Sequence, residues 1–304
     1  MNKVLAITGA TGKKSGGYFT QVLSEHADQI SSMFPGGIRA TIRASSDTSL
    51  LDKSSIHFQK CMGILEDSNF LKTVFSGVDT IVHIAGIQLS MTIVETAISC
   101  GVRRLILVHT TGIYSKYKQA GEGYRKIEDY IYKACKDAGI ILTILRPTMI
   151  YGNLHDNNVV QFIQMVDKFP LMPVVNGARY DLQPVHYSDL SKAYYQVLMH
   201  EETTANKDFI LSGGSPITLR DMLTTIGKQL GKRVRFVSCP YPIAYVGAIV
   251  LYGVSLTKID YREKVQRLCE PRVFSYQEAK EAFGYSPIVF EEGITNEIKD
   301  YKRG

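Results

Sequence analysis

The sequence contains few cysteines, and no two of them lie close together. The chain has five cysteines in 304 residues, an odd number, and no Cys-x-x-Cys pair occurs. This distribution excludes the disulfide framework of small secreted proteins. It predicts buried free thiols in a reducing compartment, and therefore a cytoplasmic protein. No signal peptide is expected, because the apolar run after Lys3 ends within a few residues in a glycine-rich turn.

Metal and nucleic-acid signatures are also missing. The seven histidines show no HExxH or paired ligand spacing, so we predict no metal site. Lysine and arginine number 35 against 29 acidic residues, a net charge of +6. The densest basic runs, at residues 116–118 and 232–235, are short for a nucleic-acid surface. We therefore expect a small-molecule substrate and no nucleic acid, with a phosphate pocket accounting for part of the positive charge.

Long hydrophobic runs are absent as well. The uncharged segment 243–256 falls short of the roughly 20 apolar residues that a membrane-spanning helix needs. Pro240 and Pro242 precede it. We expect a buried or interfacial helix of a smaller lobe, with contact to a membrane surface as the alternative.

The first 17 residues have the pattern of a strand, a glycine-rich turn and a helix. An apolar run at residues 4–7 leads into Thr8-Gly9-Ala10-Thr11-Gly12-Lys13-Lys14-Ser15-Gly16-Gly17. Gly9 permits a tight turn, Gly12 lets the backbone approach a pyrophosphate, and a third glycine lets helix and strand pack closely. The helix N-terminus adds free N–H groups and partial positive charge. We assign the phosphate site to Gly9, Thr11, Gly12, Lys13 and Gly16; an ordinary tight turn is the alternative.

Strand and helix patterns then alternate through two thirds of the chain. We expect strands at 38–43, 56–61, 80–85, 104–109 and 141–146, and helices at 66–75, 92–99 and 124–138. Continuous apolar strands between helices predict an α/β fold with a Rossmann-type doubly wound parallel sheet. A further strand at 209–211 and helices at 190–200 and 219–230, the latter capped by Thr218, follow. We assign 1–150, plus about 185–212, to a nucleotide-binding domain, and 151–184 and 213–304 to a smaller, mostly helical C-terminal lobe.

Several motifs occur in an order that resembles extended and atypical short-chain dehydrogenase/reductases. They are Thr8-Gly9-Ala10-Thr11-Gly12, Val82-His83-Ile84-Ala85-Gly86, Gly101-Val102-Arg103-Arg104, Thr110-Thr111-Gly112-Ile113-Tyr114, Leu145-Arg146-Pro147-Thr148 and Gln183-Pro184-Val185-His186-Tyr187-Ser188-Asp189. The ending Ala282-Phe283-Gly284-Tyr285-Ser286-Pro287 is similar to the tail of the sugar-nucleotide epimerase/dehydratase branch. The Gly12-Lys13 turn and the short 88–91 link resemble NmrA-like and other atypical branches, one of which includes a complex I accessory subunit.

This resemblance implies an NAD(P)-dependent oxidoreductase or epimerase/dehydratase-like protein. It also implies cofactor contacts at Ala85, Gly86 and Pro147. The oligomeric state is open, with a homodimer as one candidate.

The residue that ends the second strand distinguishes NAD from NADP in this fold. An acidic residue there binds the ribose 2′-hydroxyl and favours NAD. Arg43 occupies the position, and an arginine fork suits a 2′-phosphate. Lys13 or Lys14 adds a second cation. We therefore predict NADP, with NAD as the alternative and a solvated strand-end charge as the other interpretation of Arg43.

The family's catalytic residues align only in part. The resemblance implies a Ser or Thr at the end of the fifth strand, a role that Thr110 and Thr111 fill, and a Tyr-x-x-x-Lys pair on the long helix. Counting back from Gly139 and Arg146, the lysine position falls on Tyr124 and the tyrosine position on Ala120.

The proton donor therefore has two candidates, with Thr111 orienting the substrate. They are Tyr124, acting with Lys126, and Tyr114 at the sheet edge; Lys118 has the right spacing from Tyr114 but follows the strand too closely. We expect the substrate near Thr111, Tyr114, Pro147, Thr148 and His186, although His186 alternatively caps the neighbouring helix.

Three functions are compatible with these residues. The first is an NADP-dependent oxidoreductase or epimerase-like enzyme with an altered proton donor. The second is a dinucleotide-binding protein without turnover, serving as a redox sensor or assembly subunit. The third, a flavin or quinone reductase, tolerates loss of the tyrosine because hydride passes directly to its acceptor.

Overall fold

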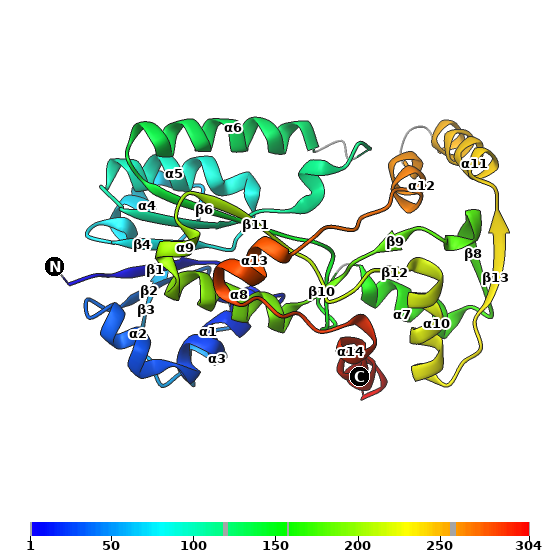
Figure 1. Ribbon diagram of the computed structural model, residues 1–304, viewed down its shortest axis with the longest axis horizontal. Helices are drawn as coiled ribbons and strands as arrows, with labels where there is room; N and C mark the ends of the chain where they lie inside the picture. The colour runs from blue at the N-terminus through cyan, green and yellow to red at the C-terminus, as the bar shows by residue number, and fades with distance from the viewer. Residues whose placement is uncertain (1, 118–120, 157, 256–259, 304) are drawn as a thin grey trace.

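A seven-stranded parallel sheet forms the centre of the molecule (Figure 1). The computed structural model describes residues 2–117, 121–156, 158–255 and 260–303. The strand order is β11-β6-β5-β4-β1-β2-β3, and every neighbouring pair is parallel. The strands are β1 (Leu5–Thr8), β2 (Ile38–Ile42), β3 (Phe58–Met62), β4 (Thr80–His83), β5 (Arg104–Val108), β6 (Ile141–Pro147) and β11 (Lys207–Leu211). The predicted Rossmann-type fold is confirmed, and its strands lie within a few residues of the predicted positions.

Helices cover both faces of the sheet, which is why its strands have continuous apolar sequences. One face carries α1 (Gly16–Glu25), α2 (Ala27–Met33), α3 (Ser49–Asp52) and α8 (Tyr187–Met199); the other carries α4 (Ser68–Phe75), α5 (Ser90–Ser99) and α6 (Gly121–Asp137). Phe19 and Tyr194 are buried in the core on the first face, and Leu71 and Ile131 in the core on the second.

One segment belongs to the nucleotide-binding domain and not, as predicted, to the smaller lobe. Residues 276–285, which include α13 (Gln277–Phe283), were assigned to the smaller lobe. Their side chains Ala279, Phe283 and Tyr285 instead belong to the core of the main sheet, where the Phe283 ring lies 5.2 Å from that of Phe209 on β11. The chain therefore crosses back to the nucleotide-binding domain before it ends.

The smaller lobe has its own core and is mostly helical, as predicted. Its helices are α7 (Val159–Lys168), α10 (Leu219–Leu230), α11 (Tyr241–Val254), α12 (Arg262–Leu268) and α14 (Phe290–Arg303). Three two-stranded ladders join β7 (Ile150–Tyr151) to β10 (Val185–His186), β9 (Asp181–Leu182) to β12 (Ile217–Thr218), and β8 (Leu171–Val175) to β13 (Arg235–Cys239). Thr218 caps α10 as expected, since its Oγ1 accepts the N–H of Asp221 at 3.0 Å.

The uncharged segment is the helix α11, but it is not buried. Ala248 is its one buried residue, while Ile243 is 64%, Val246 58% and Val254 77% exposed. Of the expected buried or interfacial helix, the buried form is wrong: α12 packs against one side of α11, which lies at the far end of the smaller lobe from the main sheet (Figure 1). The interfacial form and the alternative of membrane-surface contact stay predictions. Within the described ranges, no helix is both long enough and apolar enough to span a bilayer.

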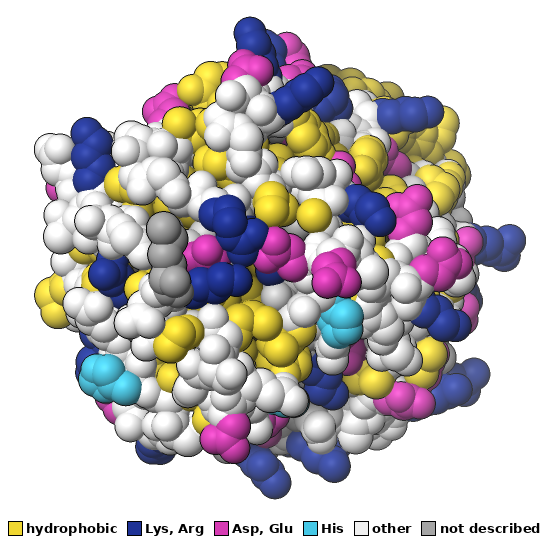
Figure 2. All heavy atoms as spheres, turned by 60° about the vertical axis from the view of Figure 1, so that its left-hand side comes forward, with side chains coloured by type: hydrophobic (Ala, Val, Ile, Leu, Met, Phe, Trp, Pro, Cys, Tyr) yellow, Lys and Arg dark blue, Asp and Glu magenta, His cyan; other side chains and the backbone are white. Residues whose placement is uncertain are grey.

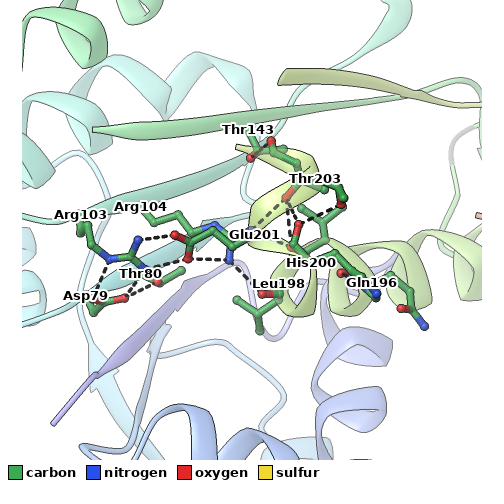
Figure 3. Close-up of polar contacts among 12 residues, drawn as sticks. Asp79, Thr80, Arg103, Arg104, Thr143, Gln196, Leu198, His200, Glu201 and Thr203 are labelled. Carbon is green, nitrogen blue, oxygen red and sulfur yellow. Dashed lines mark hydrogen bonds and ion pairs between the residues drawn. The ribbon is translucent and has the colours of Figure 1, made fainter. Parts of the chain in front are cut away.

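The Arg103-Arg104 motif lies at the start of β5, at the opposite end of this central strand from its carboxyl end. Arg103 lies between Asp79 and Glu201 and donates to both carboxylates (Figure 3). Arg104 is 2% exposed, and its guanidinium donates to the carbonyls of Leu198 and Val197 at 2.9 and 2.7 Å. These contacts tie β5 to α8 and α9 (Glu201–Thr204), so this motif supports the fold and not the chemistry.

The surface carries charges of both signs. On the face that Figure 2 shows, basic and acidic side chains are interspersed. All five cysteines are unpaired; Cys135 is buried and the other four are half-buried, so burial of all the thiols is not borne out.

Candidate functional site

Two adjoining cavities lie where the carboxyl ends of the central strands face the smaller lobe. The strand order reverses between β1 and β4, and open α/β sheets bind ligands at such a point. The first cavity, of about 430 Å³, runs along the glycine-rich turn, and we call it the dinucleotide cavity. The second, of about 650 Å³, lies between the ends of β5 and β6 and the smaller lobe, and we call it the substrate cavity. Lys14 and Ile150 line both, so the cavities meet.

The glycine-rich turn has the geometry of a phosphate cradle. Gly9 has a φ of +83°, and a Cβ there would lie 2.9 Å from the backbone nitrogen of Ala85. A Cβ on Gly16 would lie 1.9 Å from the Gly9 oxygen. Backbone packing therefore requires glycine at both positions. Gly12 donates its N–H to the Gly9 oxygen at 2.9 Å and lines the dinucleotide cavity.

Both lobes hold this turn in place. Tyr194 on α8 is buried, and its hydroxyl lies 3.2 Å from that of Ser15. Asn153 of the smaller lobe donates to the carbonyl of Lys13 at 3.1 Å. Ser15 does not cap α1 with its side chain, and in the first turn Gly17 donates its N–H to the Gly12 carbonyl at 2.9 Å, so the turn and the start of the helix are joined at the cavity.

Arg43 lines the dinucleotide cavity directly after β2. The side chain is exposed, and its backbone forms a turn in which Ser46 donates to the Arg43 carbonyl at 2.9 Å. Thr11 donates to the Ser46 hydroxyl at 3.2 Å, which links this turn to the phosphate cradle.

The same turn brings Asp47 into the cavity lining, a residue that the sequence analysis missed. The backbone N–H of Ser49 holds the pKa of Asp47 below its usual value, and Lys13 lowers it further. Asp47 lies four residues after Arg43, and only the fold of the turn returns the chain to the cavity there.

His83 positions the loop that closes the other end of this cavity. Ala85, Gly86 and Pro147 line that end, as predicted for the cofactor. His83 is fully buried, and burial lowers its pKa to about 4. Its Nε2 lies 2.9 Å from the Gly86 oxygen, which can only accept, so Nε2 carries the proton. Its Nδ1 therefore accepts from Thr8 at 2.6 Å.

A buried charge network supports the ends of β5 and β6. Glu128 on α6 accepts from Arg146 at 2.6 Å and lies 2.8 Å from Nδ1 of His109, which also lines the dinucleotide cavity. Burial alone would raise the pKa of Glu128, but the hydrogen bonds from His109 and Arg146 hold it below the usual value. Arg146 also donates to Asp208 on β11 at 2.9 Å. The network fixes His109 and Pro147 relative to α6.

Thr111 and Tyr114 lie together in the substrate cavity, in the short helix η2 (Thr111–Tyr114). Thr111 donates to the carbonyl of Pro147 at 3.2 Å. The ring of Tyr114 lies 5.7 Å from that of Phe274, and the residue is 48% exposed. Burial raises the pKa of Tyr114, with Arg146 acting in the opposite direction, so its phenol is protonated at neutral pH.

Tyr124 lies outside the residues that line either cavity. Its hydroxyl accepts from Gln88 at 3.2 Å, beside the loop that follows β4. Lys126 is exposed and pairs with Glu122 at 2.8 Å. The structure therefore places neither Tyr124 nor Lys126 in the lining of the two cavities. Ala120 and Lys118 lie outside the described residues.

The remaining predicted contacts separate into two groups. Thr148 lines the substrate cavity, whereas Pro147 lines the dinucleotide cavity. His186 lines neither: it is buried at the start of α8, and its Nδ1 accepts the backbone N–H of Ser188 at 3.4 Å. His186 is therefore a helix cap, the alternative that the sequence left open.

Two arginines of the smaller lobe also reach the substrate cavity, and the sequence analysis did not identify them. Arg267 and Arg272 line it, and the buried Nε of each has no hydrogen-bond partner among the described residues. Burial lowers the pKa of Arg272 to about 10. Glu270 lies between them in sequence but accepts from Ser115 at 2.6 Å across the cleft. Both side chains are half-buried, and Arg267 also lies 3.7 Å from Glu263. A half-buried guanidinium with an open donor favours an anionic ligand.

Across the described ranges, no cluster of three histidine, cysteine or acidic side chains has the geometry to hold a metal ion.

Comparison of the chain with known proteins finds one matching family model and several similar sequences. The model of the NmrA-like family matches residues 1–267. A stretch of 102 residues is 26% identical to NADH dehydrogenase (ubiquinone) 1 alpha subcomplex subunit 9 of Arabidopsis thaliana mitochondria, covering 34% of this chain and 25% of that protein. A stretch of 171 residues is 24% identical to 2-alkyl-3-oxoalkanoate reductase of Stenotrophomonas maltophilia, covering 53% and 52%.

Solved structures share the whole fold. The crystal structure of gox2253 matches with a TM-score of 0.79 at 18% identity, covering 99% of this chain and 98% of that one. The dTDP-glucose 4,6-dehydratase DesIV of Streptomyces venezuelae, with NAD and TYD bound, matches with a TM-score of 0.73 at 17% identity, covering 99% and 97%.

Proposed function

Because this chain belongs to the NmrA-like family, we propose that it is an NADP-dependent oxidoreductase or epimerase-like enzyme with a non-standard proton donor. The observation that carries the proposal is the pair of adjoining cavities at the carboxyl edge of the sheet. The glycine-rich turn fits a pyrophosphate, because Gly9 and Gly16 permit its tight backbone packing, Gly12 lines the cavity without a side chain, and α1 begins there with its positive end. A bound nicotinamide supplies the hydride; the residues of the chain bind the substrate and move the proton.

Arg43 supports the choice of NADP. We expect Arg43→Ala to weaken NADPH binding by about 1.5–3 kcal/mol, the range for a hydrogen bond to a charged group. NADH binding should change little, because that cofactor has no 2′-phosphate. Titration calorimetry with both cofactors measures the difference. Equal affinities of the unaltered protein for NADPH and NADH would contradict the choice of NADP. In that case Asp47, which lines the same cavity, would be the candidate to bind the ribose hydroxyls.

Thr111 and Tyr114 support the chemical role of the substrate cavity. A protonated phenol on the cavity wall can donate to a carbonyl oxygen as that oxygen gains charge. At neutral pH this phenol keeps its proton, so it can serve as a proton donor, and little phenolate is present to serve as a base. Arg272 and Arg267 indicate a substrate with a phosphate or carboxylate group.

We expect Tyr114→Phe to lower the turnover of such a substrate by about 100-fold, the lower end of general acid catalysis. Tyr124→Phe is the matched control, because Tyr124 lines neither cavity. The measurement is NADPH oxidation with carbonyls, quinones and sugar nucleotides, each with and without an anionic group. Loss of a brisk activity in Tyr124→Phe alone would establish the family's usual arrangement instead.

A dinucleotide-binding protein without turnover is the second candidate. The position of Lys126, the lysine of the predicted Tyr124 pair, favours it, because Lys126 is exposed and pairs with Glu122 at 2.8 Å. NADPH binding without oxidation across the whole panel would support this function and exclude the first.

A further inference from the structure

The outward side of α11 is an exposed aliphatic surface, which we call the α11 face. It consists of six side chains that are 39% to 77% exposed: Ile243, Val246, Ile249, Val250, Leu251 and Val254. The 14-residue helix carries no charged residue. Isolated apolar side chains are normal on a protein surface, but six on one helix form a patch that needs a partner.

Tyrosine side chains border this face on the side toward the protein. Tyr241, Tyr245 and Tyr252 are half-buried, and the rings of the first two stack at 5.7 Å. The guanidinium of Arg262 on α12 lies 3.9 Å from the Tyr252 ring centre. The aromatic rings therefore flank the aliphatic face on one side and do not form its centre.

This arrangement favours a lipid partner over a protein partner. The centres of protein interfaces are enriched in aromatic residues, methionine and arginine, whereas leucine and valine are under-represented among their energetic anchors. A bilayer requires only apolar volume at the centre, with amphipathic tyrosines at the level of the headgroups. The α11 face has the composition that suits a bilayer.

The charge of the surrounding chain points to anionic lipids. Residues 222–259 include five basic residues and no acidic residue. Arg233 and Arg235 are exposed at the start of β13, the strand that leads into α11, whereas Lys232 pairs with Asp167 at 2.6 Å. A basic segment in the same lobe as an apolar helix adds attraction to the negative surface of a membrane.

We propose that α11 docks this chain onto the surface of a bilayer that contains anionic phospholipids. The α11 face enters the boundary between headgroups and acyl chains, without crossing the membrane. Because α12 packs against α11 and contributes Arg267 to the substrate cavity, docking brings the mouth of that cavity toward the lipid headgroups.

The chain contains no tryptophan, so a single introduced tryptophan reports on its own surroundings. We expect the emission of Val246→Trp to shift to the blue with phosphatidylcholine vesicles that contain about 30% phosphatidylglycerol. Met62→Trp is the matched control: Met62 is 65% exposed on β3, in the other domain, and its replacement should not respond. Vesicles of phosphatidylcholine alone should bind about tenfold more weakly. An unchanged Val246→Trp spectrum overturns the proposal.

Co-sedimentation of the otherwise unaltered chain provides the second measurement. Val250→Asp should lower its partition onto the mixed vesicles by about tenfold, with an unchanged melting temperature because the side chain is exposed. If the chain instead forms dimers that Val250→Asp dissociates, and does not sediment with vesicles, the partner is a second copy and the proposal is wrong.

Discussion

Replacing Gly12 by valine should abolish NADPH binding and leave the chain folded. Gly12 lines the dinucleotide cavity, so a larger side chain there occupies the space of the pyrophosphate. The expected loss in affinity is at least about 100-fold, because steric exclusion removes the phosphate contacts together. Titration calorimetry measures the binding, and circular dichroism establishes that the fold is retained.

The same variant should also lose a little stability. A Cβ on Gly12 would lie 3.0 Å from the Gly9 oxygen, a tight contact that a small shift of the turn can relieve. Gly123→Val is the matched control, because a Cβ at Gly123 on α6 meets open space. It should keep full affinity for NADPH. Retained binding in Gly12→Val would mean that the dinucleotide lies elsewhere.

Removing the carboxylate of Glu128 should produce the largest loss of stability. Glu128 is 3% exposed and joins His109 on β5 to Arg146 on β6. Glu128→Ala leaves the guanidinium of Arg146 buried with only the partly exposed Asp208 as a carboxylate partner. The expected decrease in the free energy of unfolding is about 3–5 kcal/mol, the range for breaking a buried ion pair. Urea denaturation measures it.

The control for this prediction is on the same helix. Glu122 pairs with Lys126 on the exposed side of α6, and Glu122→Ala should cause no measurable loss because such pairs are screened by solvent. If both variants unfold at the same urea concentration, the buried network does not stabilise the junction of β5 and β6.

The pH dependence has a definite sign. The folded-state pKa of Glu128 lies below its usual value of 4.5, so the stabilisation is complete above that value and is lost as the pH falls through the folded-state pKa. The acid limb of a stability–pH curve should therefore be shallower in Glu128→Ala than in the unaltered chain.

The parallel sheet was predictable because its signals are local. Buried strands with helices on both faces have continuous apolar sequences, and glycines end several helices of this chain. The boundaries shifted by a few residues because hydrogen bonds to neighbouring strands, and not the sequence pattern, set where a strand ends. The phosphate turn was predictable for the same reason: its glycines, the strand and the helix are contiguous in sequence.

The composition of the site was predictable only in part. Thr111 and Tyr114 follow β5 directly and do line the substrate cavity. Arg267 and Arg272 come from a segment more than 150 residues away, and no local pattern shows that they reach the same cavity. His186 has the residue type of a catalytic group, but its environment makes it a cap.

The sequence alone therefore determined what depends on neighbouring residues: the Rossmann-type sheet, the glycine-rich turn, Arg43 at the end of the second strand and the short-chain dehydrogenase/reductase resemblance. The tertiary structure decided what depends on distant residues. It joined Glu128 to His109 and Arg146, returned residues 276–285 to the main sheet, and left one side of α11 exposed. The physical reason is that burial and partnership depend on which segments of the chain meet, and an apolar helix has the same sequence whether or not another element covers it.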